Sequence, residues 1–140
     1  MSEGIELKNK KYAQLSETEK GNLNCFADPD MIFLTNFTAA QPDDLYNNTI
    51  GNYDWSEIDA IEDQRVYKCP LGIYRSYTPG ADTPVTLLWY AKTIYPELFT
   101  DIDLTKEAKE YYNTVFGIDL TDEQIETMFA PPSEAAGGVF

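Results

Sequence analysis

The sequence predicts an α/β fold: a three-layer lobe with a mostly parallel sheet flanked by helices, and a helical carboxy-terminal region. Two short segments, the apolar run 31–35 and residues 65–69 with their β-favouring side chains, have the composition of β-strands. A connection of about thirty residues with a helix-start signal separates them, which is typical of a βαβ unit. Three segments with helical patterns then follow.

The sequence pattern of the amino-terminal part predicts a helix followed by a strand. Ser16 and Glu19 have the spacing of a capping box, which opens a short helix toward Phe26. The continuous apolar run 31–35 follows the turn residues 28–30, so we expect a strand buried on both faces.

The connection to the second strand has mixed character. Pro42 followed by Asp43 and Asp44 predicts a helix start, because proline fits the first turn and carboxylates favour the positive end of the helix dipole. Residues 55–61 can form a helical turn, and residues 65–69 are the second strand candidate.

An aromatic loop, residues 73–77, leaves the carboxyl end of the second strand. Thr83 as a cap and Pro84 at the first helical position then predict a well-buried helix that ends near Tyr95. The next helix covers residues 104–116 and is terminated by Gly117.

The last helix begins at a second capping box, Thr121 with Gln124, and stops before Pro131 and Pro132. Residues 131–140 are predicted to be a flexible tail, and residues 1–130 a single lobe.

Composition and charge exclude several classes of function. The 140 residues hold 24 Asp and Glu against 10 Lys and Arg, a net charge of −14, which disfavours nucleic acid and anionic membrane surfaces as partners. The chain has no histidine, which excludes Ser-His-Asp triads, His-based zinc sites and haem ligation by histidine. Cys25 and Cys69 lie in no Cys-x-x-Cys pair; they could form one disulfide, but free and buried thiols are the favoured expectation.

Catalytic patterns are missing from the sequence. The carboxylates have ordinary explanations as turn formers, helix-start charges or surface residues, and Gly137-Gly138 neither follows a strand nor opens a helix. We therefore expect no enzyme, no resident cofactor and no metal site. A carboxylate-only α/β enzyme is the least favoured alternative.

Five residues are candidates for ligand binding. Ligands of open α/β sheets bind outside the carboxyl ends of the strands, where Asn36 and Phe37 of one loop should meet Tyr74, Arg75 and Tyr77 of the next. Arg75 could pair with an anion and the tyrosines could stack on a flat ligand. Equally, the rings could pack on the following helix while Arg75 neutralises nearby acids.

Five landmarks occur in an order that resembles one protein family. They are residues 28–34, 65–72, 87–92, 95–103 and 111–117. Their order and spacing resemble the second lobe of iron-complex ABC-transporter substrate-binding proteins, which carry siderophores, haem or cobalamin. The resemblance covers residues 16–128.

The resemblance implies a binding protein and a site. In this family two lobes of a periplasmic-binding-protein-like fold hold an iron chelate, haem or corrinoid between them, and acidic side chains dock on an ABC permease. By position, residues 74–77 would face the cleft, and Asp43 or Asp44 would dock on the permease.

The resemblance also implies an extracytoplasmic parent protein, in the periplasm or as a cell-surface lipoprotein. No secretory signal, amino-terminal lobe or membrane-inserting segment is recognisable, so we expect a fragment, an engineered chain or a truncated gene product that binds a chelate weakly by itself and can self-associate. The alternative function is a stand-alone acidic protein-interaction module without a transport ligand.

Overall fold

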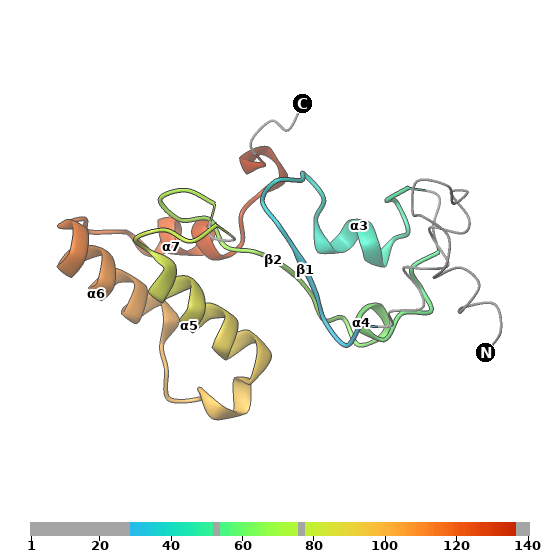
Figure 1. Cartoon of the computed structure of the whole chain (residues 1–140), viewed down its shortest axis with the longest axis horizontal. Helices are drawn as coiled ribbons and strands as arrows, with labels where there is room; N and C mark the ends of the chain where they lie inside the picture. The colour runs from blue at the N-terminus through green and yellow to red at the C-terminus, as the bar shows by residue number, and fades with distance from the viewer. Residues whose placement is uncertain (1–28, 52–53, 76–77, 137–140) are drawn as a thin grey trace. The chain divides into compact units, whose positions relative to one another are not determined.

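The computed structural model describes residues 29–51, 54–75 and 78–136 (Figure 1). The chain divides into two compact units. Of the described residues, the first unit contains 29–34, 40–51 and 54–67, and the second contains 35–39, 68–75 and 78–136. The helix predicted from Ser16 to Phe26 lies outside the described residues.

The first unit is built on a parallel pair of strands. Strand β1 (Ile32–Leu34) pairs with β2 (Val66–Lys68), whose last residue, Lys68, is assigned to the second unit, and the Ile32 amide donates to the Arg65 carbonyl over 3.0 Å. Both strands lie where the sequence predicts them. The expectation that the first strand is buried on both faces is wrong, because all three residues of β1 are only half-buried.

Two short helices complete the first unit. Helix α3 (Pro42–Tyr46) begins with the predicted proline and carboxylates, and helix α4 (Asp59–Glu62) occupies the end of the predicted helical turn. Side chains from both helices meet those of β2 in one apolar cluster. Its buried members are Leu45, Ile58, Ala60, Ile61 and Val66.

The second unit is helical in its described part. It contains α5 (Thr83–Ile94), the 3-10 turn η2 (Pro96–Leu98), α6 (Leu104–Phe116), α7 (Asp122–Phe129) and the 3-10 turn η3 (Ser133–Ala135). Its core consists of Val85, Ala108, Tyr112 and Ile125, which come from all three α-helices. The η3 turn lies within the predicted tail.

Helix α5 differs from the prediction in two ways. Its cap is Asp82, and Thr83 is already helical, so the helix starts one residue earlier than the sequence pattern indicates. The helix is also less buried than predicted, since the Leu87 side chain is 61% exposed. An apolar sequence does not reveal which part of a helix lacks a packing partner within the chain.

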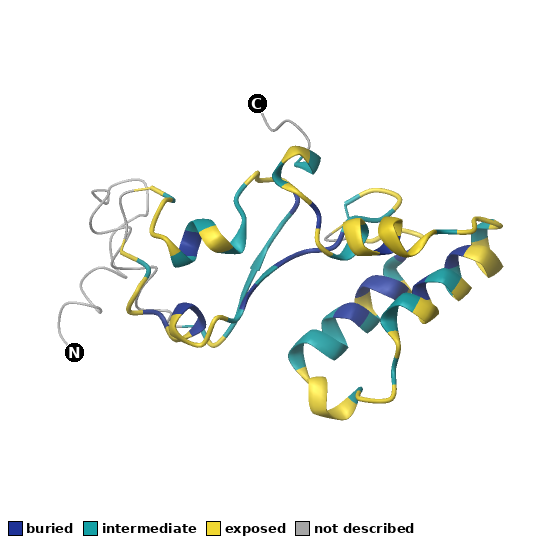
Figure 2. Ribbon diagram, turned by 180° about the vertical axis from the view of Figure 1, so that it is seen from behind, coloured by how far each residue is buried: buried dark blue, intermediate teal, exposed yellow. Residues whose placement is uncertain are grey.

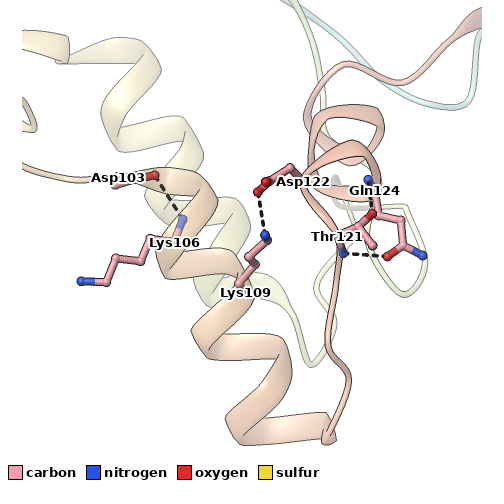
Figure 3. A network of polar contacts seen from close by, with 6 residues as sticks. All are labelled: Asp103, Lys106, Lys109, Thr121, Asp122 and Gln124. Carbon is pink, nitrogen blue, oxygen red and sulfur yellow. Dashed lines mark hydrogen bonds and ion pairs between the residues drawn. The ribbon is translucent and has the colours of Figure 1, made fainter.

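The ends of α6 and α7 are fixed by local hydrogen bonds (Figure 3). The Asp103 carboxylate accepts from the Lys106 amide over 3.1 Å at the start of α6, and Gly117 ends this helix at φ 67°. Thr121 and Gln124 form the predicted capping box of α7. A polar tie joins the two helices, because Lys109 Nζ lies 2.6 Å from an Asp122 carboxylate oxygen.

Helices α6 and α7 of the second unit are amphipathic. Figure 2 shows buried and exposed positions alternating around α6, and Ala108 and Tyr112 form its buried side. Val115, seven residues after Ala108 and so on the same side of an α-helix, is 50% exposed. No helix among the described residues has the length and apolar character needed to cross a membrane.

Candidate functional site

The candidate site lies in the second unit, where segment 35–39 meets the start of the aromatic loop. Lys68 ends strand β2, and residues 69–72 lead from it to the loop. An antiparallel bridge pairs Leu71 with Arg75, and the Gly72 amide donates to the Tyr74 carbonyl over 3.1 Å. Residues 71–75 thus form a tight turn that presents Ile73 and Tyr74 to solvent, with exposed fractions of 58% and 62%.

Arg75 joins the two segments of the site. Its guanidinium donates a hydrogen bond to the Asn36 carbonyl and lies over the Phe37 ring, with Cζ 4.7 Å from the ring centroid. The Tyr74 ring centroid lies 6.0 Å from the same carbon. Such a cation-π arrangement holds the guanidinium in place. The structure therefore brings together Asn36, Phe37, Tyr74 and Arg75, as the sequence predicts.

Asn36 holds together the two chain segments of the site. Its side chain is buried, and its amide nitrogen donates to the carbonyls of Cys69 and Pro70, each over 2.7 Å. Both amide N–H groups are engaged by these two bonds. Asn36 thus ties segment 35–39 to the start of the loop, and direct contact of its side chain with a ligand stays a prediction.

Tyr77 lies outside the described residues. Of the two predicted docking carboxylates, Asp44 has a structural role in the first unit, because its oxygen atoms accept from the Gln41 amide over 2.8 Å and from the Thr49 hydroxyl over 3.1 Å. Asp43 is exposed on the first turn of α3.

Lys68 is a site residue that the sequence reasoning missed. Its side chain is buried, and Nζ donates to the carbonyls of Thr35 over 3.2 Å and Thr38 over 2.6 Å. Together with Arg75, which bonds the carbonyl of Asn36, it places a second positive charge against segment 35–38. The available signal was a lysine inside a strand of otherwise apolar and aromatic residues.

Cys69 follows Lys68 in the segment that leads from β2 to the aromatic loop. Its thiol is free and fully buried, with Sγ 3.0 Å from the Tyr90 hydroxyl oxygen. Burial raises the pKa of this thiol, so it stays protonated and unreactive at neutral pH. Within the described ranges, no group of three or more Cys, Asp or Glu residues is arranged to hold a metal ion.

The loop, the aromatic rings and the two cations form a small cationic edge on an acidic chain. Charge-assisted hydrogen bonds from a guanidinium and stacking on aromatic rings are means of recognising an anionic ligand. None of these groups is a nucleophile paired with a base, so the arrangement is suited to binding.

Comparison with known proteins agrees with a binding role. A periplasmic solute-binding protein from Veillonella parvula has a similar crystal structure, with a TM-score of 0.74 and 38% sequence identity over 79% of this chain. The described chain therefore has the α/β fold of a lobe of a periplasmic solute-binding protein.

A second similar protein is the molybdate-binding protein MolA from Haemophilus influenzae. It is 29% identical over an alignment of 79 positions, which covers 52% of this chain. The chain spans 33% of the Veillonella protein and 21% of MolA, and no family model matches it. Neither relative is named for an iron complex, so the comparisons support a solute-binding protein without supporting the predicted iron-complex type.

Proposed function

We propose that this chain forms one lobe of the solute-binding component of an ABC importer, that it works outside the cytoplasm, and that it has no enzymatic activity. The observation that carries the proposal is the 38% identity and the TM-score of 0.74 to a periplasmic solute-binding protein over 79% of the chain. The cationic edge at Lys68 and Arg75 supports it, because it provides recognition groups without catalytic ones.

The proposed solute is an anionic metal species. Two cations contact neighbouring carbonyls of segment 35–38, and they concentrate positive charge in a chain whose net charge is −14. Molybdate is one candidate, because MolA is a molybdate-binding protein. A ferric siderophore or other iron complex is the second candidate, supported by the ordered sequence landmarks. Both present negatively charged oxygen atoms to a guanidinium.

Arg75 is proposed to be the main anion-binding group. Among the described residues, its guanidinium makes a single hydrogen bond, to the Asn36 carbonyl, although an arginine has five N–H donors. The Phe37 ring fixes its plane, and the exposed Tyr74 ring stands beside it to cover one side of the solute. Tyr77 belongs to this proposal by its position in the sequence.

The proposed partner of the first unit is a permease. Asp43 is the better candidate for docking because it is exposed, whereas the Asp44 carboxylate is already held in the cap of α3. Replacing Asp44 would loosen the helix as well as remove a charge.

Calorimetric titration of the protein expressed from its complete reading frame tests the function. The solutes are molybdate, a ferric siderophore, haem and cobalamin, and sulfate serves as an oxyanion control. We expect binding of molybdate or the ferric siderophore, weakened about 10- to 100-fold by Arg75→Ala, since a hydrogen bond to a charged group contributes about 1.5–3 kcal/mol. Arg65→Ala, which removes the other arginine of these 140 residues, is the control and should bind like the wild type. Equal affinities of the two variants would refute the role of Arg75, and no binding of any solute would refute the function.

A further inference from the structure

Asp82 occupies an unusual position for a buried carboxylate. It is the cap residue of α5, where an aspartate ordinarily accepts a hydrogen bond from the first turn of the helix, yet its side chain makes no such bond. Instead, its Oδ2 atom accepts from the Ile73 amide over 2.7 Å and from the Tyr112 hydroxyl over 3.0 Å. The residue is only 4% exposed, so these bonds are shielded from water.

The two partners of Asp82 connect the aromatic loop to the helical core. Ile73 is the first residue of the loop and directly precedes Tyr74 and Arg75, which form the proposed site. Tyr112 lies on α6 and is 5% exposed within the core of the second unit. Burial, and then the hydrogen bond to Asp82, raise the pKa of Tyr112, so the hydroxyl remains a donor. The exposed loop is therefore attached to a rigid helix through one carboxylate.

The other attachments of this turn use different atoms. The Leu71 amide donates to the Met128 carbonyl at the end of α7 over 2.7 Å, and Arg75 donates to the Asn36 carbonyl. These bonds hold the two ends of the turn, whereas the Asp82 bond holds its middle. Because Ile73 and Tyr74 are more than half exposed, packing contributes little to fixing this part of the turn.

We infer that Asp82, oriented by Tyr112, is a positioning residue that holds residues 73–75 in the conformation that presents Tyr74 and Arg75 to the solute. The carboxylate acts through the Ile73 amide and touches no solute. The structural part of this inference stands on the geometry of Asp82, and its consequence for affinity rests on the proposed solute-binding function.

Amide hydrogen exchange of the free protein tests the structural part. The variants are Asp82→Asn and Tyr112→Phe, and Tyr111→Phe is the matched control, because the adjacent Tyr111 hydroxyl donates to the Ala81 carbonyl over 2.6 Å and not to Asp82. Asparagine keeps an acceptor oxygen but removes the charge, and a hydrogen bond to a charged acceptor is about twice as strong as one to a neutral acceptor, so we expect the Ile73 amide to exchange about five- to tenfold faster in Asp82→Asn. Tyr112→Phe should give a smaller increase, and Tyr111→Phe should stay within about twofold of the wild type.

Exchange at Ile73 that is unchanged in both test variants, or that rises equally in Tyr111→Phe, would overturn the inference. Tyr112→Phe preserves the ring in the core, so it gives a folded test protein even where Asp82→Asn is unstable. Titration of the same variants with molybdate and a ferric siderophore tests the consequence, with an expected loss of affinity in Tyr112→Phe but not in Tyr111→Phe.

The exchange and titration experiments distinguish a failure of the proposed function from a failure of the loop-positioning inference. A wild-type protein that binds neither solute, with exchange at Ile73 still raised in the variants, refutes the proposed function and supports the positioning of the loop. A wild-type protein that binds, with raised exchange in Tyr112→Phe and unchanged affinity, overturns the link between loop order and binding.

Discussion

Cationic side chains in this acidic protein bond to main-chain carbonyls. Lys68 and Arg75 hold segment 35–38, and Lys92 on α5 donates to the carbonyls of Phe99, over 3.0 Å, and Ile102. By contrast, Lys109 pairs with an exposed carboxylate, Asp122, and such surface pairs contribute at most about 1 kcal/mol. The two cations of the site, Lys68 and Arg75, are thus among the cationic side chains that order loops through main-chain carbonyls.

The sequence predicts a residue of the site only where its position after the end of a strand determines its place in the fold. Phe37, Tyr74 and Arg75 follow two neighbouring parallel strands, so their meeting in space was predictable. Lys68 and Asp82 were missed, because a charged residue that is buried by long-range contacts looks the same in a sequence as an exposed one. The same reason hides the supporting position of Asn36.

Cys69 gives a first prediction, concerning thiol reactivity. In a Cys25→Ser background, the remaining thiol should react with iodoacetamide at neutral pH at least about tenfold more slowly than in the urea-unfolded chain, because burial keeps it protonated and covered. Mass spectrometry of timed samples measures both rates. Equal rates in the folded and unfolded chains would contradict the buried position of Cys69.

Tyr112 gives a second prediction, concerning stability at alkaline pH. Its pKa is raised in the folded state by burial, by the hydrogen bond to Asp82 and by the nearby negative charge. Folding therefore favours the protonated phenol, and this stabilisation is complete below the pKa of an unfolded tyrosine, about 10, and is lost as the pH rises above it. The free energy of unfolding should thus fall less steeply above pH 10 in Tyr112→Phe than in the wild type. Urea unfolding of both proteins between pH 8 and 11 measures this difference, and parallel curves would contradict it.

At the level of elements, helix ends with local signals were predicted well. The sequence predicts α6 from Leu104 to Phe116 with its glycine terminator, and α7 from its capping box, because these signals act between residues a few positions apart. The sequence pattern assigns the cap of α5 to Thr83, because a capping residue there directly precedes Pro84. The actual cap is Asp82, whose side chain makes a long-range contact that the sequence does not reveal. The prediction that β1 is buried on both faces was wrong for a similar reason, because the burial of a strand depends on which other segments cover its two faces.

Gly117 gives a third prediction, at the level of α6. Its φ of 67° lies in the left-handed region, and an added Cβ would meet nothing within 4 Å, so only backbone strain opposes a substitution. Gly117→Ala should lower the free energy of unfolding by about 1–2 kcal/mol. Gly117→Asn, which tolerates this conformation better, should cost less. Urea denaturation gives both values, and an alanine variant as stable as the wild type would contradict the cap.

At the scale of the whole molecule, the proposed role in binding rests on the similarity of the fold. The similarity to a periplasmic solute-binding protein covers 79% of the chain but 33% of that protein, so the relative contains much that this chain does not match. A pocket that holds a solute firmly encloses most of its surface, whereas the edge at Tyr74 and Arg75 is open. We therefore expect this chain by itself to bind weakly, and its tendency to self-associate stays a prediction.

Nuclear magnetic resonance mapping of the 140-residue chain tests the central claim most directly, because it detects weak binding and locates it. The account predicts that millimolar molybdate or a ferric-siderophore analogue containing diamagnetic gallium shifts the amide signals of Phe37 and residues 73–75. The amides of Lys109 and Asp122, at the polar tie between α6 and α7, should stay unchanged. Shifts centred on that tie, or no shift with either solute, would contradict the account.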